Sequence, residues 1–213
     1  MFKENKRKII FTSFLTLLPM YVGCILWNRL PDTIATHFGA DNTANGWSSK
    51  PFTVFAIPIF LLIAHFLGLT ATAADPKRKN IGPKPLQFVF WIVPAISFIM
   101  TVSIYGNALG YAVDIGFSCS LLLGLVFLIL GNTLPKARQN YTFGFKLPWT
   151  LHDPENWNRT NRLAGYCMVA AGIVLLATAY WHNSWIIFAA LLIVFVLPTA
   201  YSYLYYIRHT RQQ

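Results

Sequence analysis

Apolar residues gather in six long blocks along the chain, and shorter polar segments separate the blocks. Each block has about 20 residues, which is the length that an α-helix needs to cross about 30 Å of hydrocarbon. The apolar residues within a block follow neither the helical nor the strand period, so a helix formed there would be apolar all round. The blocks cover residues 9–27, 51–74, 85–105, 112–134, 163–181 and 185–205. This pattern predicts an all-α polytopic membrane protein with six transmembrane helices.

Composition argues against the alternative, which is a buried helical bundle in a soluble protein. Of the 213 residues, 55% are hydrophobic and 11% are charged, whereas charged residues make up roughly 25% of soluble domains. A chain of this length has too little amphipathic surface to enclose six helices that are apolar on every face. We therefore keep the membrane interpretation.

The net charge of +10 is divided unevenly between alternate loops. Of the 17 lysines and arginines, Arg29 and Lys50 lie in loops on one side of the predicted membrane, and all the others lie on the opposite side. The positive-inside rule assigns the side rich in lysine and arginine to the cytoplasm. We therefore expect cytoplasmic N- and C-termini and attraction to anionic membrane lipids, with no direct binding of nucleic acid.

Two long polar loops, at residues 28–50 and 135–162, share a pattern at matching positions. Near each, Asn-x-Leu-Pro is followed by Phe-Gly and then by Trp with a hydroxyl residue. The halves 1–109 and 110–213 thus each have the order span, long loop, span, short loop, span. Because an odd number of spans gives the halves opposite orientations, the pattern favours an inverted repeat. Chance similarity between two loops that contain proline and glycine is the alternative.

Several local signals place the ends of elements. Asp75-Pro76 stops the second span. Asp153-Pro154-Glu155 has a capping acid, a proline in the first turn and a second acid near the positive helix end, so the fifth helix should begin near Pro154. Residues 33–38 alternate weakly and could form a short strand. Small residues recur at heptad spacing in the fifth span, which predicts close helix packing near the centre of the bundle.

The second long loop carries a sequence motif. It reads G-N-T-L-P-K at residues 131–136, N-Y-T-F-G-F-K-L-P-W-T-L at 140–151 and W-N-R-T-N-R-L-A-G at 157–165. This motif resembles that of the SdpI family, bacterial membrane proteins that confer immunity to the secreted sporulation-delaying-protein toxin. The first loop resembles the membrane module that often precedes the family motif, through Leu30-Pro31, Ile34, His37-Phe38, Gly46-Trp47 and Ser49-Lys50.

Two residues depart from the family pattern. Lys146 stands where the family usually has arginine, and lysine keeps the charge but loses the bidentate fork of the guanidinium. Asn161 stands where the family usually has histidine, so any role of a titratable side chain there does not carry over to this chain.

The resemblance implies a multi-pass protein of the bacterial plasma membrane that binds and neutralises a peptide toxin. In a signalling member it also implies capture of a small repressor protein at the inner face. Planar side chains beside cations suit such binding. The candidate toxin- or partner-binding residues are His37, Phe38 and Trp47 outside, and Arg138, Asn140, Lys146, Trp149, Thr150, Trp157 and Arg162 inside. The simpler alternative for each loop is a cap over helix ends, with the basic residues touching lipid phosphates.

Other functions find less support in the sequence. His65 is the one ionisable candidate near the middle of a span; it is either a functional residue or a neutral histidine bonded to a neighbouring helix. Together with the repeat, it motivates a small secondary transporter as the alternative function. Asp32, His37 and Asp41 could gather round a cation, although their spacing is not diagnostic. The chain shows no enzyme signature, and we expect no catalysis, no cofactor and no metal site.

Overall fold

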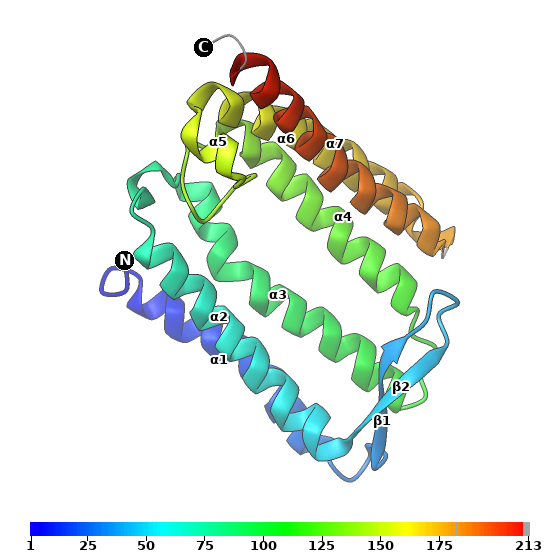
Figure 1. Ribbon diagram of the computed structural model, residues 1–213. Helices are drawn as coiled ribbons and strands as arrows, with labels where there is room; N and C mark the ends of the chain where they lie inside the picture. The colour runs from blue at the N-terminus through cyan, green and yellow to red at the C-terminus, as the bar shows by residue number, and fades with distance from the viewer. Residues whose placement is uncertain (182, 211–213) are drawn as a thin grey trace. The chain divides into compact units, whose positions relative to one another are not determined.

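The computed structural model describes residues 1–181 and 183–210. In these residues six helices are long and apolar enough to cross a membrane, which confirms the predicted fold class. The helices are α1 (Lys6–Ile25), α2 (Ile57–Ala74), α3 (Pro83–Ala108), α4 (Ile115–Thr133), α6 (Pro154–Ala177) and α7 (Ser184–Thr210) (Figure 1). A short helix, α5 (Pro148–His152), lies between α4 and α6 in the chain.

Shorter turns connect or extend these helices. A π-helical turn, Phe52–Ala56, precedes α2, so the second span runs from Phe52 to Ala74. The Ser49 hydroxyl accepts a hydrogen bond from the Phe52 N–H at 3.4 Å, at the start of this span. Within the described residues, three 3₁₀ turns cover Arg78–Asn80, Leu134–Lys136 and Ala179–Trp181.

The predicted ends of two spans are confirmed. Helix α2 ends at Ala74, directly before Asp75-Pro76. Helix α6 begins at Pro154, and the Asp153 side chain accepts hydrogen bonds from the N–H groups of Glu155 and Asn156. A carboxylate at this position satisfies backbone donors that have no partner inside the helix. Helix α6 therefore begins well before residues 163–181, the apolar block from which this span was predicted.

The predicted short strand is also confirmed, and it has a partner that the sequence did not reveal. Strand β1 (Thr33–Phe38) pairs antiparallel with β2 (Ala44–Ser49), with a bulge near His37. The turn between them places Asn42 at φ 63°, a left-handed conformation that asparagine tolerates. The Asn42 side-chain oxygen accepts hydrogen bonds from the N–H groups of Ile115 and Gly116, both at 3.1 Å. The hairpin tip thus caps the start of α4.

The chain divides into two compact units: Met1–Ala73 with Gln87–Cys119, and Ala74–Leu86 with Ser120–Gln213. The predicted halves, residues 1–109 and 110–213, and their inverted repeat stay predictions.

In the first unit, polar side chains and one glycine join the helices. Ser97 of α3 donates a hydrogen bond to the Thr16 carbonyl of α1 at 2.9 Å. The Tyr105 hydroxyl donates to the Pro19 carbonyl at 3.2 Å. Beside it, a Cβ added to Gly23 would lie 2.6 Å from that hydroxyl, so the close contact of α1 and α3 requires glycine. Such bonds replace those that water would make outside the membrane.

The hairpin is held to the first unit by an apolar cluster. Ile34 of β1 is buried there with Leu30, Val54, Ile104 and Tyr105. The hairpin is therefore anchored through one strand, and its register sets which side chains remain exposed.

In the second unit, α4 and α6 approach each other through glycines. A Cβ added to Gly165 would lie 2.8 Å from the Gly131 carbonyl oxygen, and one added to Gly172 would lie 2.8 Å from the Gly124 carbonyl oxygen. Helix α6 is also the most buried of the six spans. The close packing predicted from the small residues of the fifth span is confirmed.

Candidate functional site

The segment between α4 and α6, residues 134–153, is called the motif loop below. Asn140 organises its first half. Its fully buried side chain accepts hydrogen bonds from the N–H groups of Thr142 and Phe143, and donates to the carbonyls of Arg138 and Phe143. One carboxamide thus satisfies four backbone groups that have no helix or strand to pair with. Asn140, a predicted binding residue, bonds to its own loop.

Asp75 fastens the segment after α2 to the motif loop. Its carboxylate accepts hydrogen bonds from the Tyr141 N–H at 2.9 Å, the Thr142 hydroxyl at 2.8 Å and the Lys77 N–H at 2.8 Å. Asp75 is buried, and a buried carboxylate needs such donors. The sequence analysis missed this role, because Asp75-Pro76 was interpreted only as a helix stop.

Gln139 makes a second connection to the same segment. Its side-chain oxygen accepts a hydrogen bond from the Lys77 amine, and its carbonyl accepts one from the Asn80 side chain at 2.7 Å. Its side-chain nitrogen donates to the carbonyls of Thr150 and Leu151. Gln139 therefore joins three stretches of chain, a role that nothing in its sequence position indicates.

Two residues of α6, Trp157 and Asn161, hydrogen-bond to the backbone of the motif loop. The Trp157 indole is fully buried and donates to the Ala137 carbonyl at 2.8 Å. The Asn161 oxygen accepts from the Phe145 N–H at 2.9 Å, and its nitrogen donates to the Trp157 carbonyl. Above them Gly144 has φ 125°, and a Cβ there would lie 2.8 Å from both side chains. The motif therefore requires glycine at this point for both conformation and space.

Thr150 and Trp149 sit on helix α5. The buried Thr150 hydroxyl donates to the Phe145 carbonyl at 2.7 Å and accepts from the Leu147 N–H at 3.0 Å. The half-buried Trp149 indole donates to the Ser202 hydroxyl of α7 at 2.9 Å. Thr150 shapes the loop, whereas Trp149 ties the loop to α7.

The predicted cations of this region are exposed. Arg138, Lys146 and Arg162 all have exposed side chains, although the Lys146 amine donates to the Thr142 carbonyl at 3.1 Å. Arg162 lines an open pocket of about 740 Å³ beside Tyr166 and Tyr201. The structure thus separates the predicted residues of this region into buried ones that hold the loop, the half-buried Trp149, and exposed cations.

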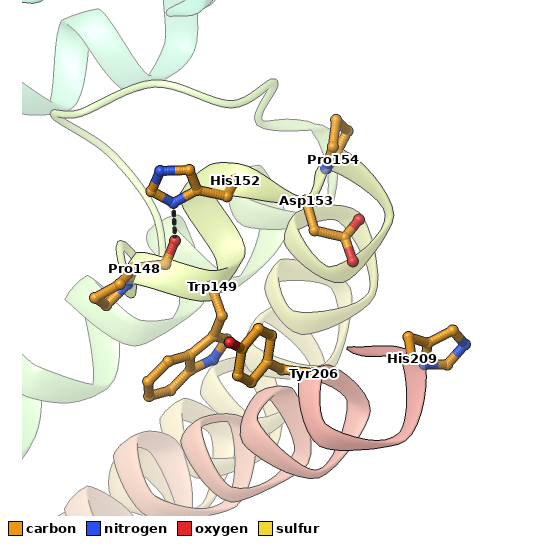
Figure 2. Close-up of a pocket in the computed structure, with 7 residues that line it drawn as sticks. All are labelled: Pro148, Trp149, His152, Asp153, Pro154, Tyr206 and His209. Carbon is orange, nitrogen blue, oxygen red and sulfur yellow. Dashed lines mark hydrogen bonds between the residues drawn. The ribbon is translucent and has the colours of Figure 1, made fainter. Parts of the chain in front are cut away.

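A second pocket, of about 610 Å³, opens where α5 meets the end of α7. Figure 2 shows the Trp149 and Tyr206 rings lying against each other, with the side chains of His152, Asp153 and His209 around them. The His152 ring donates from Nδ1 to the Pro148 carbonyl at 2.6 Å, and Asp153 caps α6. Each polar group therefore has a structural partner, and the arrangement offers aromatic surface rather than a reactive pair.

At the hairpin, the three predicted residues lie on both strands. His37 of β1 is exposed and its Nδ1 is hydrogen-bonded to the Asn45 side chain of β2. Phe38 is half-buried, and Trp47 of β2 is 61% exposed. An apolar ring so exposed is available to a membrane surface or a partner.

The suggested cation ligands are engaged separately. Asp32 pairs with Lys50 at 3.1 Å, and His37 bonds to Asn45. The hydroxyl and the N–H of Thr43 hold the pKa of Asp41 below its usual value. Within the described residues no group of three His, Cys, Asp or Glu side chains could hold a metal ion. The structure therefore does not gather these three side chains round one point.

His65 of α2 is buried and bonded to a neighbouring helix. Its Nε2 lies 3.0 Å from the Thr12 hydroxyl of α1, which itself bonds to backbone carbonyls. Its Nδ1 is buried without a hydrogen-bond partner among the described residues. The interpretation as a histidine bonded to another helix is confirmed for one of its two nitrogens.

Comparisons with known proteins agree with the motif. Residues 136–202 match the SdpI/YfhL protein family, and residues 14–62 match a domain of unknown function (DUF1648). The chain is 29% identical to "Immunity protein SdpI" of Bacillus subtilis (strain 168) over 204 residues, which cover 94% of this chain and 96% of that protein. No solved structure matches the chain. The resemblance to the SdpI family is confirmed.

Proposed function

We propose, from the SdpI-family region that this chain carries, that it is an immunity protein which protects a bacterial plasma membrane from a secreted antimicrobial peptide. The observation that carries the proposal is the similarity to an immunity protein along almost the full length of both chains. That similarity covers the hairpin as well as the motif loop. Protection by binding needs no turnover, in agreement with a site whose polar groups have structural partners.

The proposal includes an orientation for the chain. Lysine and arginine in membrane proteins gather on the cytoplasmic side, and this rule places the termini, residues 75–84 and the motif loop inside. Because successive spans alternate in direction, the hairpin then faces outside. A toxin that arrives from outside meets the hairpin first.

The hairpin has two features that suit an extended peptide. Its sheet has two strands in the described residues, so each strand has one edge without a ladder partner. Such an edge can pair with another extended chain. Trp47, which pairs with Ala35 of β1, offers an exposed ring on β2. The hairpin thus gives a peptide both apolar contact and backbone hydrogen bonds.

The motif loop supplies the inner part of the proposal. Asn140, Thr150 and Trp157 keep the loop in shape through the hydrogen bonds described above. Arg138, Lys146 and Arg162 remain exposed, and Arg162 lines a pocket with Tyr166 and Tyr201. Cations near aromatic side chains can dominate a small binding patch. In a signalling member this surface would capture a small repressor protein.

Expression in a toxin-sensitive strain that lacks its own immunity gene tests the proposal. Cells that carry the wild-type chain should survive a panel of related secreted peptides, and Trp47→Ala should lower survival at equal membrane abundance. Trp185→Ala, which alters another exposed tryptophan, should leave survival unchanged. Survival no better than that of the empty vector against every peptide would refute the immunity function.

Transport is the second candidate, and the unpartnered Nδ1 of His65 is the observation that favours it. A buried ionisable group within a span can relay protons. Proton flux into proteoliposomes that contain the purified chain, lost in His65→Gln, would establish transport. Flux equal to that of empty liposomes would remove this candidate.

A further inference from the structure

The second unit contains a pocket of about 330 Å³ that the proposed immunity function does not use. One wall is the segment 80–85, and the other is formed by the end of α4 and the first half of the motif loop. Pockets that bind small molecules have volumes of roughly 300–1,000 Å³. The pocket is therefore large enough for a ligand.

Hydrogen bonds fix both walls of the pocket. Asn80, in the first wall, donates to the Gln139 carbonyl of the motif loop. Asn140, in the second wall, is buried and bonded on all sides. Asp75, in the segment that leads from α2 to the first wall, accepts hydrogen bonds from Tyr141 and Thr142 of the motif loop. Because these bonds lie within the chain and hold both walls in place, a ligand would lose little free energy in shaping the pocket.

The lining of the pocket combines apolar surface and two amines with the uncharged polar residues Asn80, Asn132, Thr133 and Asn140. The apolar part of the lining is formed by Ile81, Pro83, Pro85, Ala137 and Phe143. The two amines belong to Lys84 and Lys136. No acidic residue lines the pocket. In the part of the chain that the structure describes, neither lysine makes an ion pair or a side-chain hydrogen bond, and both are exposed. This combination matches a molecule that has an apolar body and an anionic head.

The pocket lies where two spans end, and the ends of spans of this length fall near lipid head groups. Helix α3 begins at Pro83 and α4 ends at Thr133, so the pocket is at one end of two spans. Basic pockets at such ends on the cytoplasmic side can hold anionic head groups. We propose that this pocket binds an anionic amphiphile, with an acyl chain against the apolar lining and the head between Lys84 and Lys136. The source that fits this depth is an anionic phospholipid of the cytoplasmic leaflet, and a free fatty acid has the same chemistry.

Native mass spectrometry of the purified full-length chain in neutral detergent tests the proposal. The probes are phosphatidylglycerol, phosphatidylcholine with the same acyl chains, and oleate. The wild-type chain should retain one phosphatidylglycerol roughly tenfold more tightly than phosphatidylcholine, as two lysines near a lipid head would allow. Oleate retained in place of phosphatidylglycerol, with the same lysine dependence, would support the chemistry and assign a free fatty acid as the source.

Three variants separate the effect of the charges from that of the cavity. Lys84→Gln with Lys136→Gln should abolish the preference for the anionic lipid, whereas Arg78→Gln with Lys79→Gln, which removes equal charge outside the pocket, should preserve it. Gly82→Phe should fill the pocket and lower retention of every probe. A Cβ on Gly82 would meet only the Pro85 ring at 3.8 Å, an ordinary contact, so this variant should fold.

Three results would overturn the proposal. The first is equal retention of phosphatidylglycerol and phosphatidylcholine by the wild-type chain. The second is an equal loss of preference in the two double glutamine variants, which would indicate general attraction to a basic surface. The third is unchanged retention of all probes in folded Gly82→Phe. Circular dichroism and the thermal midpoint of each variant confirm that folded chains are compared.

Discussion

The Asp75 carboxylate accepts a hydrogen bond from the Tyr141 backbone N–H at 2.9 Å, across 66 positions of the chain. Asp75→Ala would leave this donor and those of Thr142 and Lys77 without their partner. An unsatisfied buried donor costs about 1–3 kcal/mol, so this variant should lower the thermal midpoint clearly. Asp32→Ala is the control, because the Asp32 side chain in its ion pair with Lys50 is 99% exposed and such surface pairs contribute about 0–1 kcal/mol. Equal thermal midpoints for the two variants would contradict the role of Asp75.

The glycines between α4 and α6 should resist substitution. In Gly165→Ala the new Cβ would lie 2.6 Å from the Pro135 ring and 2.8 Å from the Gly131 carbonyl. Because backbone cannot move aside easily, we expect a loss of about 1–3 kcal/mol, seen as reduced abundance in the membrane and a lower thermal midpoint. Gly68→Ala is the matched control, since a Cβ there meets nothing within 4 Å. It should be neutral or stabilise α2 by up to about 1 kcal/mol.

Asn161 should tolerate histidine better than alanine. The Asn161 oxygen accepts from the Phe145 N–H, and a neutral imidazole can place Nδ1 at a similar distance from its backbone and accept the same bond. Asn161→Ala leaves the Phe145 N–H without this acceptor and should cost about 1–3 kcal/mol. Thermal midpoints measured in detergent at pH 8, where imidazole is neutral, compare the two variants. A histidine variant less stable than the alanine variant would show that the cavity has no room for the family residue.

Cysteine labelling should establish the orientation of the chain. In a chain whose three cysteines are replaced by alanine, Asn28→Cys should react with an impermeant maleimide added to intact cells. Lys79→Cys should react only after the membrane is opened. Both positions are exposed, so the result depends on whether the maleimide can reach that side of the membrane and not on burial within the protein. The reverse pattern would invert the orientation derived from the positive charges.

Arg162 should act in recognition and not in folding. Its side chain is exposed in an open pocket, so Arg162→Ala should leave membrane abundance nearly unchanged and should abolish protection from the toxin. Arg208→Ala, which removes another exposed cation of the same unit, should keep protection. If Arg162→Ala instead removes the protein from the membrane, Arg162 is structural and its place among the binding residues is wrong.

The six spans could be predicted from sequence because their signal is local and long. The length of each span can be read from its block of apolar residues. The pair Asp153-Pro154 indicates where α6 begins. The signal for β2 was weaker, since Asn45, Gly46 and Ser48 are poor strand residues. That strand forms because Ile34 of β1 is buried among helices and the turn at Asn42 brings the chain back beside it.

The candidate site was less accessible to sequence reasoning because its key bonds are long-range. The sequence indicated Trp157 and Thr150 as important, but whether an aromatic or hydroxyl side chain faces inward depends on packing that one sequence does not state. The roles of Asp75 and Gln139 had no local signal, since their partners lie in other segments. In contrast, the exposure of Arg138 and Lys146 follows from ordinary surface preference. The toxin- and partner-binding roles stay predictions.

Trp149 and Asn156 both bond to one residue of α7. The indole donates to the Ser202 hydroxyl and the carboxamide donates to the Ser202 carbonyl, at 2.9 and 3.0 Å. A helix advances about 1.5 Å for each residue, and a hydrogen bond weakens once its atoms separate beyond their usual range of about 2.7–3.2 Å. A slide of α7 by one residue would therefore break both bonds together. Ser202 therefore fixes the position of α7 along its own axis. Any shift of α7 in that direction would also break the hydrogen bond that holds α5 against it.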